Sequence, residues 1–470
     1  MIECLSSLDQ NTIRGLELSP NNNMKLNYSG VAKENLKSGI SLSNIKSATR
    51  LKLIKNIYEK KSSDMLDWLD LPFANDDTIS RYETIGRKIA KKFDNFIVLG
   101  IGGSALGIKM LQNTFVDSIH RDIGIKIVVC DNIDSDSFVS LLDNINLKKT
   151  CFNVITKSGS TSETLAQMSI VLGRYASKKI DPKGHFVVTT TAGNDLWDFA
   201  LESGFETFSI PKGVGGRFSV LSSVGLLPAV VMGIDIRRLL AGAILGFENS
   251  SLDSDSNIAY TCAHINYTYL KSGLTNLVTM PYSDRLALLP DFFAQLWAES
   301  LGKKLDRKGN VVNAGQTPIK TIGVTDQHSQ LQLYSEGIRD KLIMFLTVDK
   351  NSYDEMIEYE NNVNSHLIGT TLKTLLDYEY QSTAYSLTTL DRPNYTIIID
   401  TIREESVGEL IFMLEMMTAY MGEMMGINTY DQPGVELSKI YTKGMLGLKG
   451  YEEKAKEIKA YNNAKKKYLL

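Results

Sequence analysis

Short runs of consecutive apolar residues alternate with helix-like stretches through the first half of the chain. The apolar runs are FIVLG (96–100), IKIVVC (125–130), CFNVIT (151–156), HFVVTT (185–190) and ETFSI (206–210). Strands of this kind are buried on both faces, which is typical of a parallel sheet covered by helices. The alternation predicts right-handed βαβ units and a doubly wound α/β domain over residues 76–247.

The same pattern restarts after the polar stretch ENSSLDSDSN (248–257). Further buried-strand runs are NLVTM (276–280), KLIMFLT (341–347) and YTIIID (395–400). Helical spacing is found near residues 285–303, 327–337, 360–378 and 405–424. We therefore predict a second doubly wound α/β/α sandwich over residues 258–430. An N-terminal helical segment (1–75) and a C-terminal helical segment (431–470) are expected to flank the two parallel-sheet domains.

The length and charge of the chain agree with this division and limit its partners. At about 100–200 residues per domain, 470 residues predict two to four domains. The formal net charge of −3 offers no broad basic surface, so we expect no nucleic-acid partner. The most apolar segment, 220–234, is interrupted by Ser222 and Pro228 and is too short to span a bilayer. We therefore expect no membrane partner.

Cysteine usage indicates the compartment. The four cysteines are far apart and form no CxxC pair: Cys4, Cys130, Cys151 and Cys262. A disulfide framework or a structural metal site is not indicated, and a reducing, cytoplasmic location is expected. The five histidines show no HExxH or similar spacing, so no catalytic metal is predicted.

A glycine-rich turn, GIGGSALG (100–107), follows the first apolar run. Glycines let the backbone approach an anion, and the helix N-terminus that follows supplies N–H donors. Gly100, Gly102 and Ala105 also fit the dinucleotide pattern GxGxxA, and Asp131 ends the next strand. Because that acid comes about 30 residues on rather than about 20, the dinucleotide interpretation is weakened. A turn that only packs a strand on a helix is a third possibility.

A second loop, TKSGSTSET (156–164), carries hydroxyls beside a lysine and opens a helix. A phosphate monoester needs several hydroxyl and backbone donors at once, and this composition favours such a ligand. The alternative is an ordinary helix N-cap, with Glu163 in a capping role.

Four further residues stand where they could carry chemistry. Arg217 follows three glycines at the start of an apolar helix, where it could stabilise developing negative charge or simply form an ion pair. Gln295 and Glu299 are four residues apart and share one helix face, so Glu299 is either a general base or a solvent-facing side chain. His328 lies just inside an apparent helix start in TDQHSQLQLYSEG (325–337).

Six segments, in this order, resemble the glucose-6-phosphate isomerase family over about residues 95–445. They are GIGGSALG (100–107), TKSGSTSET (156–164), GGRFSVLSSVGLLP (215–228), QLWAESLGK (295–303), TDQHSQLQLYSEG (325–337) and QPGVELSK (432–439). The resemblance implies two sugar isomerase (SIS) domains, a phosphorylated hexose substrate and no cofactor. It also implies reversible interconversion of glucose 6-phosphate and fructose 6-phosphate through a cis-enediolate, as in glycolysis and gluconeogenesis.

The resemblance further implies a role for each matching residue. Glu299 would move the proton between C2 and C1, Arg217 would stabilise the enediolate, and His328 with Lys439 would handle ring opening. Glu163 would orient the histidine. The residues implied to contact substrate or phosphate are Gly103, Ser104, Thr156, Lys157, Ser158, Thr161, Thr164, Gln295 and Gln432.

The family implies a homodimer whose active site is shared, with His328 acting in the neighbouring subunit's site. Two other functions remain open from the residues alone. SIS domains also serve as sugar-phosphate sensors without chemistry, and the GxGxxA match leaves a nucleotide-dependent enzyme. A sensor needs the phosphate loop but not the acid, the arginine and the ring-opening pair.

Overall fold

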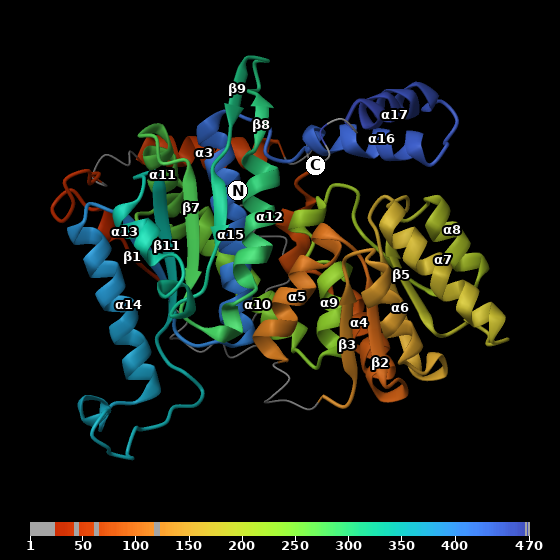
Figure 1. Ribbon diagram of the computed structural model, residues 1–470, viewed down its shortest axis with the longest axis horizontal. Coiled ribbons are helices and arrows are strands. Elements are labelled where there is room, and N and C mark those ends of the chain that lie inside the picture. Colours follow the sequence, from red (N-terminus) through yellow and green to blue (C-terminus); the bar gives the residue numbers. More distant parts are fainter. Residues whose placement is uncertain (1–23, 42–46, 61–64, 117–122, 466–467, 469–470) are drawn as a thin grey trace.

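Two α/β halves lie side by side in the computed structural model (Figure 1). The structure describes residues 24–41, 47–60, 65–116, 123–465 and 468. Cys4 and His120 lie outside the described residues, as do residues 1–23 of the predicted N-terminal segment. Among the described helices, none combines the length and apolar character needed to cross a membrane.

The first half is built on an entirely parallel sheet with the order β3-β2-β4-β5-β6. Its strands are β2 (Asn95–Leu99), β3 (Lys126–Cys130), β4 (Thr150–Ile155), β5 (Phe186–Thr190) and β6 (Glu206–Ser209). Every residue of β4 and β5 is buried, as their unbroken apolar pattern predicts for strands covered on both faces. The predicted doubly wound parallel sheet is confirmed.

Helices connect and cover these strands. They are α4 (Asp76–Lys92), α5 (Leu106–Phe115), α6 (Ser135–Asp143), α7 (Ser162–Ser177), α8 (Asp195–Glu202) and α9 (Ser223–Val231). Three of them start at an Asx residue whose side chain accepts a helix N–H: Asn75 from Thr78, Asp134 from Ser137 and Asn194 from Trp197. Each cap satisfies an N–H group that would otherwise have no partner at the helix start.

The second half has the sheet order β1-β12-β11-β7-β10. Its strands are β1 (Lys25–Asn27), β7 (Asn276–Pro281), β10 (Thr317–Lys320), β11 (Lys341–Val348) and β12 (Asn394–Ile399). Strands β7, β11 and β12 are parallel, as predicted, and β10 adds to them in parallel, but β1 pairs antiparallel with β12. Strand β10 and the hairpin of β8 (Lys303–Leu305) and β9 (Val311–Ala314) were not predicted, because their residues are mostly exposed or half-buried and lack a continuous apolar run.

A helical layer joins the two sheets into one continuous core. Its members are α10 (Ile236–Ser251), α11 (Ile258–Lys271), α12 (Leu289–Leu301) and α15 (Glu404–Met425). Helices α10 and α15 approach closely enough that a Cβ on Gly242 would lie 1.9 Å from the carbonyl oxygen of Glu405. One apolar cluster runs from the α4- and α9-facing side of the first sheet, through this layer, to the second sheet. The relative position of the two halves is therefore set by packing and not by a linker.

The N-terminal segment is not only helical, which corrects the sequence prediction. Strand β1 extends the second sheet, and α3 (Ser47–Glu59) and the 3₁₀ segment η3 (Asp67–Phe73) pack on α15 and α10. The indole of Trp68 stacks on Phe218 at 4.9 Å and also contacts Phe412 at 5.5 Å between ring centroids. The segment thus packs against both halves, and three consecutive strand residues were too few to give a pattern.

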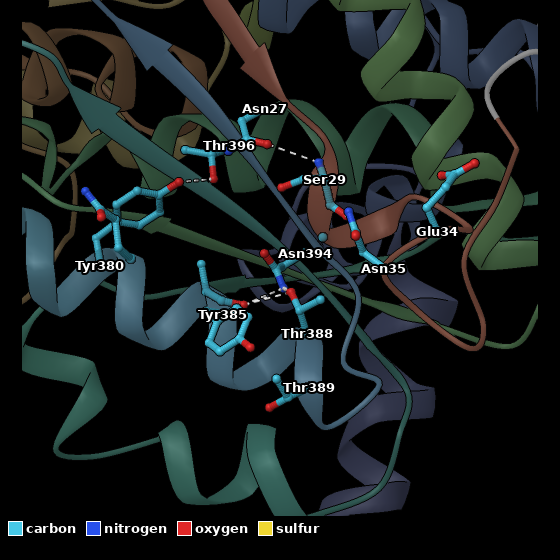
Figure 2. A pocket seen from close by; sticks show the side chains of 13 residues that line it. Asn27, Ser29, Glu34, Asn35, Tyr380, Tyr385, Thr388, Thr389, Asn394 and Thr396 are labelled. Carbon is cyan, nitrogen blue, oxygen red and sulfur yellow. Dashed lines mark hydrogen bonds between the residues drawn. The ribbon is translucent and has the colours of Figure 1, made fainter.

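One helix of the second half is shifted from its predicted range, and another is shorter than predicted. The helix expected at 360–378 is α14 (Leu372–Thr389), and the one expected at 327–337 is the shorter α13 (Leu331–Glu336). Figure 2 shows where α14 meets the edge formed by β1 and β12, around a cavity of about 520 Å³. Tyr380 bonds to Thr396 there at 2.6 Å, and Asn394 donates to Thr388 at 3.0 Å.

The C-terminal segment forms a helical hairpin, as expected. It consists of α16 (Glu436–Met445) and α17 (Glu452–Lys465), which pack on each other. In Figure 1 the hairpin extends from the body at the same end as the β8–β9 hairpin. Most of its residues are exposed.

Candidate active site

The two loops singled out in the first half meet where the sheet order reverses. Strand β2 is paired on one side with β3 and on the other with β4, so the chain winds away from this point in both directions. The glycine turn 100–104 follows β2, and the hydroxyl loop 156–161 follows β4. Ligands of doubly wound sheets bind outside the carboxyl ends of the strands at such a reversal.

The glycine turn lies directly on the loop that carries Arg217. A Cβ on Gly103 would be 2.1 Å from the carbonyl oxygen of Gly216 and 2.8 Å from the amide nitrogen of Arg217. Gly102 has a φ of +59° and faces the Gln295 amide, which lies 3.0 Å from the position of a Cβ. These contacts explain both glycines: one leaves no room for a side chain, and the other needs the left-handed region.

Helix α12 presents Gln295 and Glu299 to this turn. Gln295 donates from Nε2 to Glu299 Oε1 at 3.1 Å, and the i,i+4 spacing aligns the two side chains as the sequence predicted. The other carboxylate oxygen, Oε2, lies 3.6 Å from Arg217 Nη1. The Glu299 side chain is 30% exposed, so it is neither buried in the core nor free in solvent. A carboxylate held by an amide and a guanidinium at a partly open position can exchange a proton with a ligand.

Arg217 is buried, and almost all of its hydrogen-bonding capacity is used by the protein. Nε donates to Ser300 Oγ at 2.7 Å, Nη1 to Gln432 Oε1 at 2.8 Å, and Nη2 to the carbonyl oxygens of Thr429 (2.7 Å) and Asp431 (3.2 Å). A guanidinium has five N–H donors, so these four bonds to described residues leave one, on the nitrogen that faces Glu299. Burial lowers the Arg217 pKa, while Glu299 and Asp431 act in the opposite sense. An arginine nevertheless stays charged at all physiological pH values.

Ser300, Lys303, Thr429 and Asp431 complete this arrangement and were missed as functional residues in the sequence. Lys303 is 6% exposed and donates to the carbonyl oxygens of Glu299 (2.6 Å) and Ser300 (3.0 Å). Its Nζ also lies 3.6 Å from Asp431 Oδ1. Ser300 and Lys303 belong to the QLWAESLGK segment, so their closeness to Glu299 was the available signal.

The hydroxyl loop does not use its side chains as an ordinary N-cap. Thr161 occupies the N-cap position of α7, but its side chain accepts no helix N–H. Its hydroxyl bonds instead to that of Thr156 at 2.7 Å, and Ser160 donates to Ser158 at 3.1 Å. The first N–H groups of α7 therefore have no side-chain cap from Thr161, as an anion site at a helix start requires. Thr164 differs from the others, because its hydroxyl is buried and has no hydrogen-bond partner.

Lys157 connects the hydroxyl loop electrostatically to the rest of the site. Burial lowers its pKa, the Asp67 carboxylate raises it, and the Arg217 guanidinium lowers it. Asp67 also accepts a hydrogen bond from the Gly213 amide at 2.9 Å, at the start of the loop that carries Arg217. Asp67 is thus a further residue beside the site, and no sequence pattern marks it.

The remaining predicted residues divide into near and distant groups. Ser104 belongs to the half-buried glycine turn, and Glu163 lies in the first turn of α7. His328 and Lys439 are both exposed, and among the described residues neither bonds to Glu299 or Arg217. Lys439 donates to Glu436 at 2.8 Å on α16, and in Figure 1 the helix after His328, α13, lies beyond the second sheet from the first half. The structure therefore gathers the acid, the arginine, the glutamines and the turn, but not His328 and Lys439, the two residues predicted to open the sugar ring.

The acid required by the dinucleotide interpretation is engaged elsewhere. Asp131 follows β3, and its carboxylate forms an ion pair with Lys109 of α5 at 2.9 Å. A carboxylate in this position that binds ribose would need to accept from the sugar hydroxyls. The ion pair does not favour a nucleotide at the glycine turn.

Comparison with known proteins identifies relatives that cover most of the chain. The sequence profile of the phosphoglucose isomerase family matches residues 83–466. The chain is 43% identical over 416 residues to a glucose-6-phosphate isomerase of Carboxydothermus hydrogenoformans, a match that covers 86% of this chain and 89% of that protein. It is 37% identical over 388 residues to the glucose-6-phosphate isomerase of Thermus thermophilus, covering 81% and 90%.

Solved structures show the same overall fold. A Thermus thermophilus protein described as hypothetical superimposes with a TM-score of 0.83 at 33% identity, covering 90% of this chain and all of that one. A glucose-6-phosphate isomerase of Chlamydia trachomatis superimposes with a TM-score of 0.80 at 20% identity, covering 98% and 99% of the two chains. The second likeness concerns the fold alone.

Proposed function

The chain belongs to the phosphoglucose isomerase family, and we propose on this basis that the site around Glu299 and Arg217 interconverts glucose 6-phosphate and fructose 6-phosphate. The enzyme is an intramolecular aldose–ketose isomerase of glycolysis and gluconeogenesis. The observation that carries the proposal is the 3.6 Å approach of Glu299 to the one Arg217 donor that the protein leaves uncommitted.

In the proposed reaction, the phosphate binds at the hydroxyl loop and does not react. Hydroxyls of Thr156, Ser158 and Thr161, the α7 N-terminus and the Lys157 ammonium hold it there. The binding energy of this remote group positions the reacting carbons against Glu299. Support comes from the Thr156–Thr161 pair and from the absence of a side-chain cap at Thr161.

The chemical step needs one base and one fixed cation. With glucose 6-phosphate opened to its aldehyde, Glu299 takes the proton from C2, and the electrons form a cis-enediolate that spans C1 and C2. Glu299 then delivers the proton to C1, the O2 proton moves to O1, and the carbonyl is left at C2. The remaining Arg217 N–H stabilises the oxyanion, in a guanidinium that its four other bonds prevent from rotating.

Substrate positioning and ring opening use the other family residues. Gln295 holds the Glu299 carboxylate, and Gln432 lies beside the same arginine nitrogen. The backbone at Gly103 and the Ser104 side chain border the sugar, and Thr164 contributes to the phosphate end. His328 and Lys439 transfer protons at O5 and O1 during ring opening, and Glu163 orients the histidine.

The oligomer in this proposal is a homodimer with shared active sites, in which His328 serves the site of the other subunit. This explains why His328 is exposed and remote from Glu299 within one chain. The segment 351–371 and helix α14 carry exposed aromatic and aliphatic side chains that suit a second copy, namely Tyr353, Tyr359, Val363, Leu372, Tyr378 and Tyr385. The free thiols Cys130, Cys151 and Cys262 support a cytoplasmic location for the dimer.

A coupled assay tests the function directly. Purified protein is given fructose 6-phosphate, and glucose 6-phosphate is detected through NADPH formed by glucose-6-phosphate dehydrogenase. We expect turnover with the wild-type protein without any added cofactor in the isomerase step. Tight binding of 6-phosphogluconate without turnover would instead favour a sugar-phosphate sensor.

A further inference from the structure

Lys303 is a buried lysine at the C-terminal end of the helix that carries Glu299. Its side chain is 5% exposed, and its ammonium donates to the carbonyl oxygens of Glu299 and Ser300. These two carbonyls are among the last four of α12 and have no partner within the helix. Lys303 therefore caps α12 immediately behind the Glu299 carboxylate.

The same ammonium also faces the segment 429–432. It lies 3.6 Å from Asp431 Oδ1, and that segment supplies three of the four acceptors of Arg217, from Thr429, Asp431 and Gln432. The fourth acceptor is Ser300, whose carbonyl is bound by Lys303. Lys303 thus contacts both structures that hold Arg217. It donates to the Ser300 carbonyl, and it pairs with Asp431 in the segment that supplies the other three acceptors.

We propose that Lys303 is a positioning residue, which sets the distance and orientation between Arg217 and Glu299 by joining the end of α12 to segment 429–432. The inference rests on the proposed function, because it concerns the same pair of groups. Lys303 itself does not touch substrate in this scheme. It acts through the acceptors that keep four guanidinium donors occupied.

A simple physical consequence follows if the ammonium is removed. Segment 429–432 loses its ion pair to the end of α12 and remains joined to it through Arg217 alone among these contacts, so the acceptors of Arg217 can shift. A guanidinium with freed donors closes on the nearest carboxylate, which is Glu299 at 3.6 Å. A direct, bidentate ion pair would make Glu299 a weaker base and would turn the free N–H away from the enediolate.

The charges that surround Lys303 also predict how the effect depends on pH. The pKa of Lys303 is lowered to about 8, mainly by burial and also by the nearby Arg217, while Asp431 and Glu299 oppose the shift. Lys303 therefore loses its proton at a pH where most lysines remain charged. The positioning role should weaken as the pH rises through this range.

The test compares Lys303→Met with Lys304→Met, the neighbouring lysine that is exposed. We expect kcat of Lys303→Met for fructose 6-phosphate to fall about 10- to 100-fold, with the dissociation constant of 6-phosphogluconate changed less than about threefold. The wild-type kcat should decline above about pH 8, and this decline should be absent from the low, flat profile of the variant. Lys304→Met should match wild type in all three measurements.

A second variant covers the case in which Lys303→Met does not fold. Asp431→Asn keeps the shape of an exposed side chain but removes the charge that raises the Lys303 pKa, so its alkaline decline should move to lower pH. The positioning role is overturned if Lys303→Met keeps wild-type kcat and pH profile, or if the Asp431→Asn profile does not move. The isomerase function itself would be overturned if the wild-type protein showed no turnover. If wild type and Lys304→Met are both active, the isomerase function stands, and the Lys303→Met result then tests only the positioning role.

Discussion

Gly103 and Gly216 touch backbone to backbone, so that a single added methyl group on Gly103 would lie 2.1 Å from the Gly216 carbonyl oxygen. This contact joins the turn after β2 to the residue that precedes Arg217. The position of the guanidinium therefore depends on the absence of a side chain at Gly103, which precedes Arg217 in the chain by four strands, β3 to β6.

Gly103→Ala is expected to damage activity more than folding. The two loops must separate to accept a Cβ, at a cost on the order of 2 kcal/mol, and Arg217 moves with its loop. We expect kcat to fall at least about tenfold while the protein still unfolds cooperatively. Thermal unfolding and the coupled assay measure the two effects. Gly173→Ala on α7, where a Cβ meets nothing within 4 Å, is the control and should retain activity.

Glu299→Gln should abolish most turnover without preventing ligand binding. The amide keeps the shape and can still accept from Gln295, but it cannot take a proton from carbon. General-base loss of this kind costs about 10²–10⁴-fold in kcat. The coupled assay measures kcat, and titration with 6-phosphogluconate measures binding. Glu202→Gln, at an exposed position, is the matched control; a fully active Glu299→Gln enzyme would require another base.

Lys157→Met should weaken substrate binding through the phosphate. A charge-assisted hydrogen bond contributes about 1.5–3 kcal/mol, which corresponds to roughly a 10- to 100-fold increase in KM for fructose 6-phosphate. The effect on kcat should be smaller, because the phosphate does not react. Lys178→Met, at the other end of α7, should leave KM unchanged. An unchanged KM in Lys157→Met would remove the lysine from the phosphate site.

Mixing two inactive variants tests the shared active site. If His328 acts in the other subunit's site, a heterodimer of Glu299→Gln and His328→Ala chains contains one site with both residues intact. Random exchange makes about half of the dimers mixed, so activity should recover to about a quarter of the wild-type value. The measurement is the coupled assay after denaturation and joint refolding. No recovery, with heterodimers demonstrated by a size tag, would place His328 in its own subunit's site.

Glu409→Gln should stabilise the protein at alkaline pH. The Glu409 pKa is raised to about 7, mainly by burial and also by the charge of Asp400, while a hydrogen bond from Asn249 and the charge of Arg403 oppose the shift. The folded-state pKa lies above the unfolded one, so the carboxyl's contribution is fully present below about pH 4.5 and is lost as the pH rises through 7. At pH 8 the neutral amide should raise the unfolding free energy by on the order of 2 kcal/mol.

Thermal melts at several pH values check this prediction. The difference between Glu409→Gln and wild type should shrink toward pH 5, where the wild-type carboxyl is already protonated. A difference that is constant from pH 5 to pH 8 would show that the amide acts through packing and not through charge.

Local sequence patterns predicted the strands of the first sheet because most are short apolar runs, and the central strands β4 and β5 are buried along their whole length. The second half was less predictable at its edges. Strand β1 has only three residues, and the two outer residues are exposed, so no periodicity marks it. Likewise, α14 begins well after its predicted start, because segment 351–371 is a long exposed connection whose apolar residues imitate a helical pattern.

The candidate site divides in the same way. Residues joined by short spacing, such as Gln295 and Glu299, were paired correctly because four residues make one turn of a helix. The contacts of Asp67 and Asp431 could not be predicted, because each residue meets its partner from a segment more than 80 residues away in the chain. Ser300 and Lys303 stand in the QLWAESLGK segment next to Glu299, but their role depends on which carbonyls and donors surround them in the folded protein.

By itself, the sequence determined the two parallel α/β halves, the order of the motifs and the kinds of residue available for chemistry, because burial and helical spacing are local properties. The tertiary structure decided that Arg217 retains one uncommitted donor beside Glu299, that Lys303 lies behind both, and that His328 and Lys439 lie apart from them in one chain. Those relationships depend on which carbonyls, carboxylates and backbones meet across the sheet ends and helices, and no stretch of the sequence contains that information.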